Sequence, residues 1–350
     1  MNNPLALIRK NILKLTPYSS ARQEYTGNEG IFLDANENAF GSVVEKSLNR
    51  YPDPLQQKLK AKIGHIKNVR PESIFLGNGS DEAIDLLIRA FCEPREEKII
   101  VLPPTYGMYE VCAAINAVEV CKIPLHPSFE INVKEVLAQA DHRVKLIFIC
   151  SPNNPTANCF AASAIETLLH NFHGVVIIDE AYIDFAVGKS WLPRLTEFNN
   201  LVILQTFSKA WGLANIRLGM AFAPQPALIK ILNKIKYPYN VSGVTQQIVL
   251  NALDKVQEKD RMVQQILHER NRLRSRLEAL PIVKTIYPSD ANFLLVKVQD
   301  AREIYQFLVE HHVIVRNRSN VTHCENCLRI TVGTPEENDT LIQTLKKYST

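Results

Sequence analysis

The sequence has no long hydrophobic run and little excess of either charge. No uninterrupted apolar stretch approaches the ~20 residues that a membrane-spanning helix needs, so we expect a soluble protein that does not bind membranes. Its 40 Lys and Arg residues against 36 Asp and Glu leave a formal net charge of +4. Spread over 350 residues, this charge is too dilute to favour nucleic acid as a partner.

Cysteine is scarce, and its seven residues form an odd set. Most lie inside apolar runs such as Phe148 to Cys150, which is typical of reduced, buried thiols in a reducing compartment. The segment Met1 to Leu15 has neither the apolar core nor the cleavage site of a secretory signal, so we expect a cytoplasmic protein. Cys324 and Cys327 have the spacing of half a zinc site or of a redox pair, but no second close pair supplies four ligands. We therefore expect a loop there and no metal site.

Two nucleotide-binding motifs are incomplete. A P-loop around Gly188-Lys189-Ser190 would need glycine at position 183, where the chain has Ile183. The Gly77-x-Gly79 string would need a third glycine at position 82 for dinucleotide binding, where the chain has Glu82. Simple ATPase and dinucleotide-binding functions therefore lose their main support.

Five apolar, β-branched runs are present in the first two thirds of the chain. They lack strict alternation, as strands do when both faces of their sheet are covered, and helical patterns such as Ala161 to Phe172 lie between them. The sequence therefore predicts an α/β domain with a mostly parallel sheet flanked by helices. The runs are Lys98 to Pro103, Leu146 to Ser151, Val175 to Asp179, Leu201 to Thr206 and Leu218 to Ala223.

The pattern changes after Pro238. Long amphipathic helices are predicted at Gln246 to Asp254 and Gln257 to Leu280, followed by three short strands and a final helix that begins at Thr334 with a capping box. The strands are Asn292 to Val298, Val313 to Arg316 and Leu328 to Val332. We expect a smaller α+β domain over 241–350, a large ligand-binding domain over 41–240, and an arm over 1–40 that forms part of the small domain.

Polar residues follow the ends of four successive apolar runs, where ligands bind in open parallel sheets. These strand ends supply an aromatic ring, an amide, a carboxylate with a phenol, and a hydroxyl with an amine. Taken singly, such residues are usually caps or solvated loop residues. The four strings are Pro103-Pro104-Thr105-Tyr106, Ser151-Pro152-Asn153-Asn154-Pro155, Asp179-Glu180-Ala181-Tyr182 and Thr206-Phe207-Ser208-Lys209.

Pyridoxal 5'-phosphate (PLP) chemistry needs such a set. A lysine carries the cofactor covalently, and Lys209 at the end of a buried strand is the candidate. Asp179 would keep the ring nitrogen protonated. Tyr182 and Asn154 could donate to the ring oxygen, and Tyr106 could stack on the ring face.

The cofactor phosphate needs N–H donors and cations. Gly79 and Ser80 lead directly into a predicted amphipathic helix, whose amino terminus is an anion site, and Arg217 supplies a second contact. Asp81 and Glu82 in the same turn would repel a phosphate unless their carboxylates point away.

These strings, in this order, resemble the fold type I PLP-dependent aminotransferases, and the resemblance covers nearly the whole chain. Within that superfamily the chain is most similar to the histidinol-phosphate aminotransferases. Ala157 departs from the family, which has Gly after the Asn-Pro-Thr string, and would be strained if φ is positive there. The strings that carry the closer resemblance are Leu15-Thr16-Pro17-Tyr18, Asp34-Ala35-Asn36-Glu37-Asn38, Arg50-Tyr51-Pro52-Asp53 and Leu328-Arg329-Ile330-Thr331-Val332-Gly333-Thr334.

The resemblance implies a reversible amino-group transfer. Histidinol phosphate and 2-oxoglutarate are interconverted with imidazole acetol phosphate and glutamate. Lys209, Asp179 and Tyr182 would be catalytic. The implied cofactor-binding residues are Gly79, Ser80, Asp81, Tyr106, Asn154, Asp179, Tyr182, Thr206, Ser208, Lys209 and Arg217.

The resemblance also implies a substrate pocket in a homodimer. Arg329 and Arg316 would clamp the substrate anions, and Tyr18 and Asn36 would line the pocket. Tyr51 would reach across from the other subunit. Ordinary packing under a loop is the alternative role for the two tyrosines.

Other functions stay open at this stage. An aromatic amino acid aminotransferase or a threonine-phosphate decarboxylase would use the same cofactor set. A regulator that reuses the fold would carry a DNA-binding domain in front, for which about thirty residues are too few. A protein that merely binds phosphate does not explain Lys209 together with Asp179.

Overall fold

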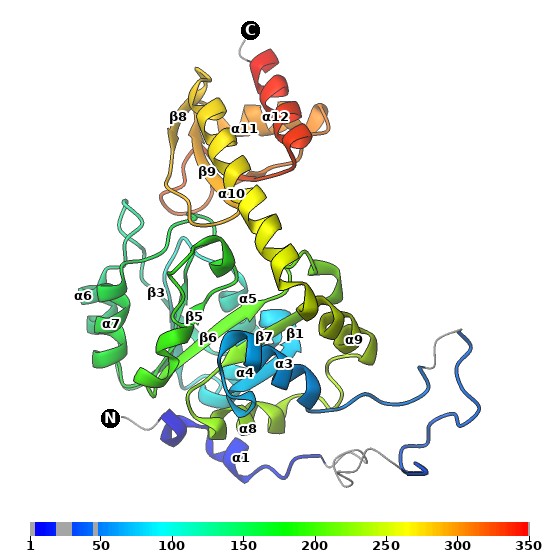
Figure 1. Ribbon diagram of the computed structural model, residues 1–350. Helices are drawn as coiled ribbons and strands as arrows, with labels where there is room; N and C mark the ends of the chain where they lie inside the picture. Colours follow the sequence, from blue (N-terminus) through cyan, green and yellow to red (C-terminus); the bar gives the residue numbers. More distant parts are fainter. Residues whose placement is uncertain (1–3, 19–29, 45–47, 349–350) are drawn as a thin grey trace.

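The larger of two sheets has seven strands in the order β1-β7-β6-β5-β4-β2-β3. This computed structural model describes residues 4–18, 30–44 and 48–348 (Figure 1). Only β7 runs antiparallel to its neighbours, so the predicted mostly parallel sheet is confirmed. The strands are β1 (Ile74–Asn78), β2 (Lys98–Val101), β3 (Glu119–Lys122), β4 (Val144–Cys150), β5 (Val175–Asp179), β6 (Leu201–Thr206) and β7 (Leu218–Phe222).

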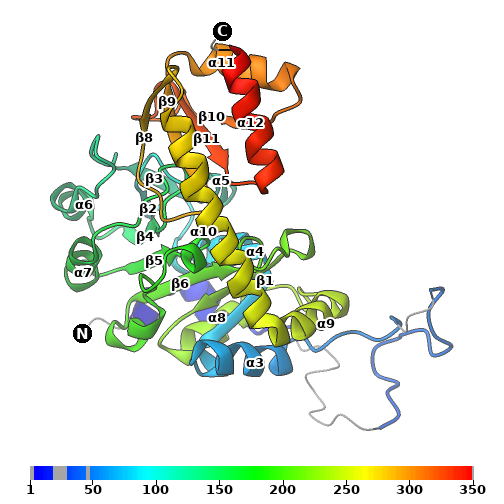
Figure 2. The same ribbon diagram turned by 45° about the horizontal axis from the view of Figure 1, so that its top comes forward.

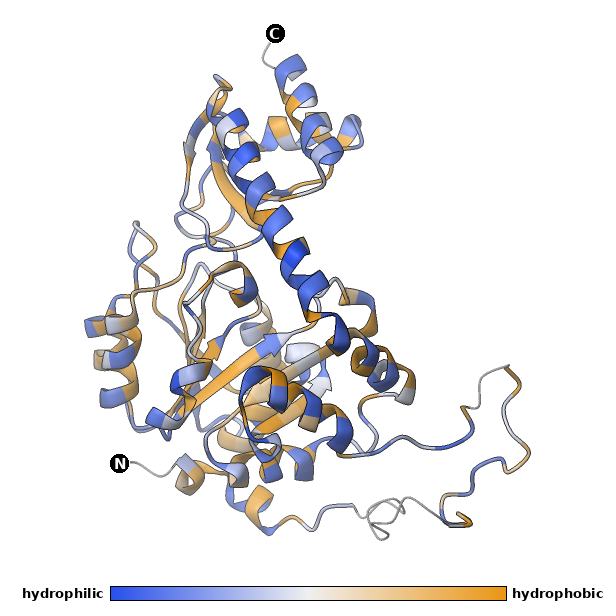
Figure 3. Ribbon diagram, in the orientation of Figure 1, coloured by the Kyte–Doolittle hydropathy of each residue, from blue (hydrophilic) through white to orange (hydrophobic). Residues whose placement is uncertain are grey.

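Both faces of this sheet are covered by helices. Successive strand residues enter two different cores: Ile100 belongs to one, and its neighbours Ile99 and Val101 belong to the other. This double burial explains why the strands are continuous apolar runs, which Figure 3 shows as hydrophobic ribbons. One face packs on α3 (Gln57–Lys67), α6 (Val133–Gln139), α7 (Ala162–Asn171) and α9 (Gly243–Ala252), and the other on α4 (Gly79–Phe91), α5 (Met108–Ile115) and α8 (Pro226–Ile235).

The second sheet is antiparallel, in the order β10-β11-β9-β8, and has a core of its own. The helix α10 (Val256–Glu278) runs from the large unit to this small one (Figure 2). The capping box at the last helix is confirmed, because Thr334 and Glu337 exchange backbone-to-side-chain hydrogen bonds of 2.8 and 3.3 Å. The elements are β8 (Val283–Ile286), β9 (Phe293–Val298), α11 (Ala301–Glu310), β10 (Arg316–Asn317), β11 (Cys327–Thr331) and α12 (Pro335–Tyr348).

The amino-terminal residues lie against the large unit. Arg9 pairs with Glu93 at the end of α4, and Lys234 of α8 donates to the carbonyl of Leu13. This packing places residues 4–14 on the large domain, although we expected part of the segment 1–40 to join the small one. The limits at residues 41 and 241 stay predictions. The short helices are η1 (Pro4–Leu7), α1 (Lys10–Lys14), η2 (Pro71–Ser73), η3 (Ile183–Phe185), η4 (Leu192–Glu197), η5 (Ala214–Ile216) and η6 (Leu253–Lys255).

The segments 30–44 and 48–52, together called the arm from here on, extend away from the large domain (Figure 1). Within its described part, an ion pair of 2.7 Å between Arg50 and Glu37 ties the arm to itself. Most of its large apolar side chains are exposed, and Phe40 and Val43 are fully so. Among the described residues, no helix is long and apolar enough to cross a membrane.

Candidate active site

A cavity lies where the carboxyl ends of β4, β5 and β6 meet the amino terminus of α4. Every residue that the sequence predicted to bind the cofactor lines it. The full lining is Gly79, Ser80, Asp81, Tyr106, Cys150, Asn154, Asp179, Ala181, Tyr182, Thr206, Ser208, Lys209, Ala214 and Arg217. The structure therefore brings together the residues of the four strand ends, as the rule for open parallel sheets predicts.

Lys209 and Asp179 enter this cavity from adjacent strand ends. Burial, followed by the positive charge of Arg329, lowers the pKa of Lys209, so a larger share of this amine is neutral and nucleophilic. The Lys209 Nζ lies 5.5 Å from the centroid of the Tyr182 ring. Asp179 is 2% exposed, and burial raises its pKa to about 6.

Two donors hold the Asp179 carboxylate. The Ala181 N–H donates to Oδ1 at 3.1 Å, and the Tyr109 hydroxyl donates to Oδ2 at 2.7 Å. Both hydrogen bonds oppose the effect of burial and lower the pKa of Asp179. Sequence reasoning missed Tyr109, whose one signal is its place three residues after Tyr106, in the first turn of α5.

The phosphate end of the predicted site is formed by α4, β7 and Arg217. A Cβ on Gly79, where φ is +70°, would lie 2.7 Å from Arg217 Nη2. A Cβ on Gly219 would lie 2.1 Å from the Ser80 nitrogen, so only glycine lets β7 approach the first turn of α4. The N–H groups of that turn have no intrahelical acceptor and lie beside a guanidinium, which makes this end of the cavity an anion site.

The two acidic residues of the same turn behave differently. Glu82 accepts from the Asn78 N–H at 2.5 Å and from Asn240, so its carboxylate turns away from the cavity. Asp81 stays in the cavity and accepts from Arg217 at 3.2 Å and from Tyr106 at 3.1 Å. A phosphate bound here must therefore take over the contact that Arg217 makes with Asp81.

The remaining polar groups of the cavity are donors. Burial raises the pKa of both Tyr106 and Tyr182, so their hydroxyls stay protonated. The Asn154 oxygen accepts from Arg329 at 2.6 Å, which leaves its NH₂ group to face a ligand. The Thr206 and Ser208 hydroxyls lie 3.0 Å apart.

Three arginines lie on one face of the β10–β11 hairpin. Arg316 is the register partner of Arg329, and the N–H of Arg318 donates to the Cys327 carbonyl, which puts all three side chains on the same face. Leu328 lies on the opposite face, in the small-domain core. Burial lowers the pKa of both Arg318 and Arg329, and the neighbouring arginines lower it further.

Within the described part of the chain, none of these three guanidiniums forms an ion pair, and the Nε atoms of Arg318 and Arg329 are buried without a hydrogen-bond partner. Such orphaned, charged donors indicate a site for an anionic ligand. The sequence prediction included Arg316 and Arg329 and missed Arg318, although it lies only two residues after Arg316.

The other predicted substrate residues do not reach the cavity of their own chain. Asn36 and Tyr51 belong to the arm, and Tyr18 is 72% exposed. Tyr51 stacks on Tyr239 with the ring centroids 4.5 Å apart.

Ala157 adopts the strained backbone that the sequence raised as a possibility. Its φ is +70°, and its methyl group is fully buried beside Tyr182 and Phe293. No catalytic side chain is lost there.

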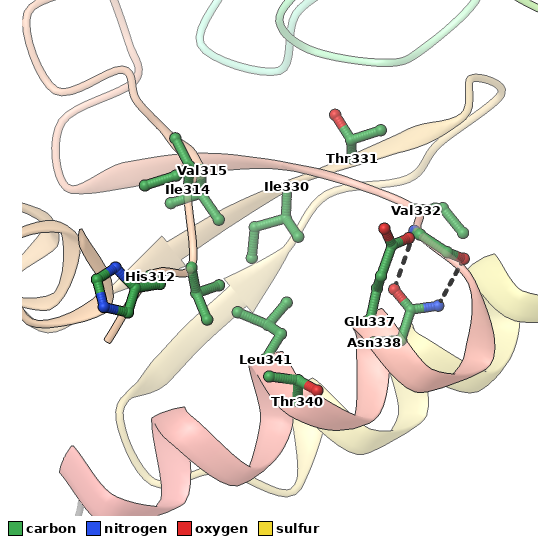
Figure 4. Close-up of a pocket in the computed structure, with 12 residues that line it drawn as sticks. His312, Ile314, Val315, Ile330, Thr331, Val332, Glu337, Asn338, Thr340 and Leu341 are labelled. Carbon is green, nitrogen blue, oxygen red and sulfur yellow. Dashed lines mark hydrogen bonds between the residues drawn. The ribbon is translucent and has the colours of Figure 1, made fainter. Parts of the chain in front are cut away.

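A second cavity lies in the small domain, between the end of β11 and α12 (Figure 4). Its walls mix aliphatic and polar side chains. The Asn338 side chain donates to the Gly333 carbonyl and accepts from the Gly333 N–H, so this amide is used in holding the start of α12. It contains no lysine and does not match the predicted chemistry. Among the described residues, no three His, Cys, Asp or Glu side chains are grouped to hold a metal ion.

Residues 28–345 match the model of the aminotransferase class I and II family. The chain belongs to this family. It is 53% identical over 343 residues to the histidinol-phosphate aminotransferase of Cytophaga hutchinsonii, with 98% of each chain covered. It is 47% identical over 342 residues to that of Flavobacterium psychrophilum, with 97% of each covered.

Solved structures of aminotransferases have the same fold. The histidinol-phosphate aminotransferase from Clostridium acetobutylicum superposes with a TM-score of 0.80 at 23% identity, over 86% of this chain and 91% of that one. The enzyme from Sinorhizobium meliloti, solved in complex with pyridoxal-5'-phosphate, superposes with a TM-score of 0.77 at 21% identity, over 90% of both chains. The fold type I architecture that the sequence predicted is confirmed.

Proposed function

We propose that this aminotransferase interconverts L-histidinol phosphate plus 2-oxoglutarate and imidazole acetol phosphate plus L-glutamate, with PLP as cofactor. The observation that carries the proposal is the identity of about half of all residues to histidinol-phosphate aminotransferases over nearly the whole chain. The activity places the enzyme in histidine biosynthesis.

The cavity residues fit PLP. Lys209 would supply the amine that holds it, the α4 amino terminus with Arg217 would bind its phosphate, and the Asp179 carboxylate would pair with the ring nitrogen. When bound, PLP supplies an electron sink for the negative charge that develops on the substrate α-carbon. Tyr182 and the Asn154 amide would donate to the ring oxygen, and Tyr106 would contact the ring.

Lys209 is also the group that moves the proton at the substrate α-carbon. Its lowered pKa increases the share of neutral amine that can accept this proton, and the side chain lines the cavity.

The arginine face of the β10–β11 hairpin holds the substrate anions. Both reaction partners carry an anion, a phosphate in one case and carboxylates in the other, and guanidinium forks bind either kind. Arg329 lies nearest the cofactor cavity, through its hydrogen bond to Asn154, and suits the group next to the reacting carbon. Arg316 and Arg318 extend the same face and supply the extra positive charge that a dianionic phosphate favours.

The protein works as a homodimer, and the arm lies on the second subunit. A segment with fully exposed Phe40 and Val43 is costly in water and fits an apolar partner surface. Tyr51 then reaches the active site of the other subunit, with Tyr18 and Asn36 near the substrate. This arrangement accounts for their distance from the cavity of their own chain. The seven free thiols fit a cytoplasmic location.

A panel of amino donors tests the function. Charge-assisted contacts contribute about 1.5 to 3 kcal/mol each, so histidinol phosphate should exceed histidinol and phenylalanine in kcat/KM by on the order of a hundredfold or more. Arg316→Ala and Arg318→Gln should each shrink this preference and affect the glutamate half-reaction less. Arg302→Gln, an exposed change on α11, is the control.

Two outcomes would overturn the proposal. Equal use of phenylalanine and histidinol phosphate would identify an aromatic aminotransferase. Carbon dioxide release from threonine phosphate would identify a decarboxylase. Such an enzyme can have this fold, because the L-threonine-O-3-phosphate decarboxylase of Porphyromonas gingivalis superposes with a TM-score of 0.74 at 22% identity, over 86% of this chain and 91% of that one. The curated relatives do not favour either alternative.

A further inference from the structure

Among the described residues, Tyr109 is the largest fully buried side chain, and its hydroxyl donates a hydrogen bond to the Asp179 carboxylate. The ring stacks on Phe148 of β4 with the centroids 4.8 Å apart and the planes 18° apart. Tyr106 packs edge-on against it at 5.6 Å and 86°. These contacts leave the Tyr109 side chain one orientation, in which its hydroxyl points at Asp179.

The contact is directed at one oxygen. Asp179 Oδ2 accepts from Tyr109 at 2.7 Å, and Oδ1 accepts from the Ala181 N–H at 3.1 Å, so the carboxylate plane is fixed from two sides. A carboxylate oxygen can accept two hydrogen bonds, so each oxygen keeps a lone pair for a third donor that comes from the cavity.

We propose that Tyr109 is a positioning residue: its hydroxyl orients the Asp179 carboxylate and keeps it charged, so that it can pair with the protonated ring nitrogen of the cofactor. This role rests on the proposed PLP chemistry. Tyr109 does not line the cavity and acts only through Asp179.

The charge of Asp179 depends on this donor because burial works against it. With both hydrogen bonds in place its pKa is about 6, already above the usual value for a carboxyl group. Without the hydroxyl, this buried carboxylate loses the one side-chain donor that the described residues give it, and its pKa rises further. The other titratable groups that face Asp179 are Asp81 from α4, Tyr106 from the loop before α5, Cys150 from β4, and Tyr182 and Lys209 from the strand ends.

The test removes one hydroxyl and keeps the ring. Tyr109→Phe, Asp179→Asn and the double variant are prepared as apoproteins, and PLP affinity is measured by titration across pH 5 to 9. Tyr348→Phe is the matched control, because it removes another tyrosine hydroxyl from a carboxylate, Glu303, on the exposed side of the small domain. Its PLP affinity should equal that of wild type.

In wild type, PLP affinity should fall as the pH drops through the Asp179 pKa near 6. Tyr109→Phe should move this fall to higher pH and weaken PLP binding at pH 7 on the order of tenfold, the loss expected for one hydrogen bond to a charged group. In the Asp179→Asn background the same change should add less than about twofold, because a residue that acts through Asp179 has nothing left to position.

Two results would overturn the inference: an unchanged pH dependence in Tyr109→Phe, or losses that multiply in the double variant. Site-specific fluorotyrosine at position 109 gives a second reading in the opposite direction, since a more acidic phenol donates more strongly and should move the fall to lower pH. Failure of the wild-type protein to bind PLP at all would instead refute the proposed function.

Discussion

Asp179 and Arg217 lie at opposite ends of the same cavity and should have separable roles. Asp179→Asn keeps the shape of a buried side chain and removes the charge that faces the ring nitrogen, so turnover should fall by several orders of magnitude at saturating PLP. Arg217→Ala should chiefly weaken PLP retention, because it removes a phosphate contact. Single-turnover rates and PLP titrations of both variants make the comparison. Near-normal turnover in Asp179→Asn would show that another group protonates the ring.

At Ala157, backbone strain lowers the free energy of unfolding, whereas chain entropy and methyl burial raise it. A left-handed backbone costs a non-glycine residue about 1 to 2 kcal/mol. Glycine would remove this cost but lose about 0.5 to 1 kcal/mol of chain entropy and about 0.8 kcal/mol of burial for the enclosed methyl group. Ala157→Gly should therefore change the free energy of unfolding by less than about 1 kcal/mol. A urea titration that finds a loss above 2 kcal/mol would show that methyl packing dominates.

The strand-end residues could be predicted from the sequence because their chemistry and their position point to the same site. Asp179 is the last residue of β5 and Lys209 lies three residues after the end of β6, so the parallel pairing of these strands brings them together. Tyr109 and Arg318 could not be found in this way. A tyrosine in the first turn of a helix is usually core, and its partner Asp179 lies 70 residues away in the chain.

At the scale of elements, the approach of β7 to α4 sets the width of the phosphate end. Gly219→Ala would place a Cβ 2.1 Å from the Ser80 nitrogen, so β7 or the first turn of α4 must move. The atoms that this Cβ would meet, in Ser80 and Gly79, are all backbone atoms and cannot rotate away. We therefore expect a loss of at least 2 kcal/mol in stability or on the order of tenfold or more in PLP affinity.

The matched control is Gly107→Ala at the start of α5, where an added Cβ meets nothing within 4 Å. This change should be neutral or stabilise the fold by up to about 1 kcal/mol. Thermal melting and PLP titration follow both variants. A Gly219→Ala protein that melts and binds like wild type would mean that the two elements are not held this closely.

Element boundaries were predictable where burial on both faces makes a strand continuous, as in β5 and β6. The strands β1, β3 and β8 were not predicted. The apolar run of β1 is only Ile74 to Leu76 before Gly77, and the exposed residues of β3 and β8 break the apolar pattern. β10 is shorter than predicted and begins at Arg316, since the preceding residues Val313 to Val315 border the small-domain cavity instead of pairing.

At the scale of the whole molecule, one chain holds a cofactor cavity without the arm residues that the sequence assigned to the substrate. Tyr51 lies on a segment that leaves the large domain (Figure 1), and the cavity lining contains no residue of the arm. The direction of the arm could not be predicted from its sequence, because its apolar residues show neither helical nor strand periodicity. A site shared between two subunits is what the homodimer proposal requires.

Subunit mixing tests this arrangement directly. Tyr51→Ala and Lys209→Ala proteins should each have little or no activity as homodimers. In a heterodimer whose sites are built across the interface, one site carries both defects and the other carries neither. Random pairing makes half of the dimers mixed, and each of these has one intact site. Mixing and subunit exchange should therefore recover up to about a quarter of wild-type activity. Lys209→Ala mixed with Asp179→Asn is the matched control, because both residues line one chain's cavity, so every site of a heterodimer keeps one defect and mixing should recover nothing. Confirmed heterodimers of the Tyr51 and Lys209 variants without recovered activity would place Tyr51 in its own subunit's site.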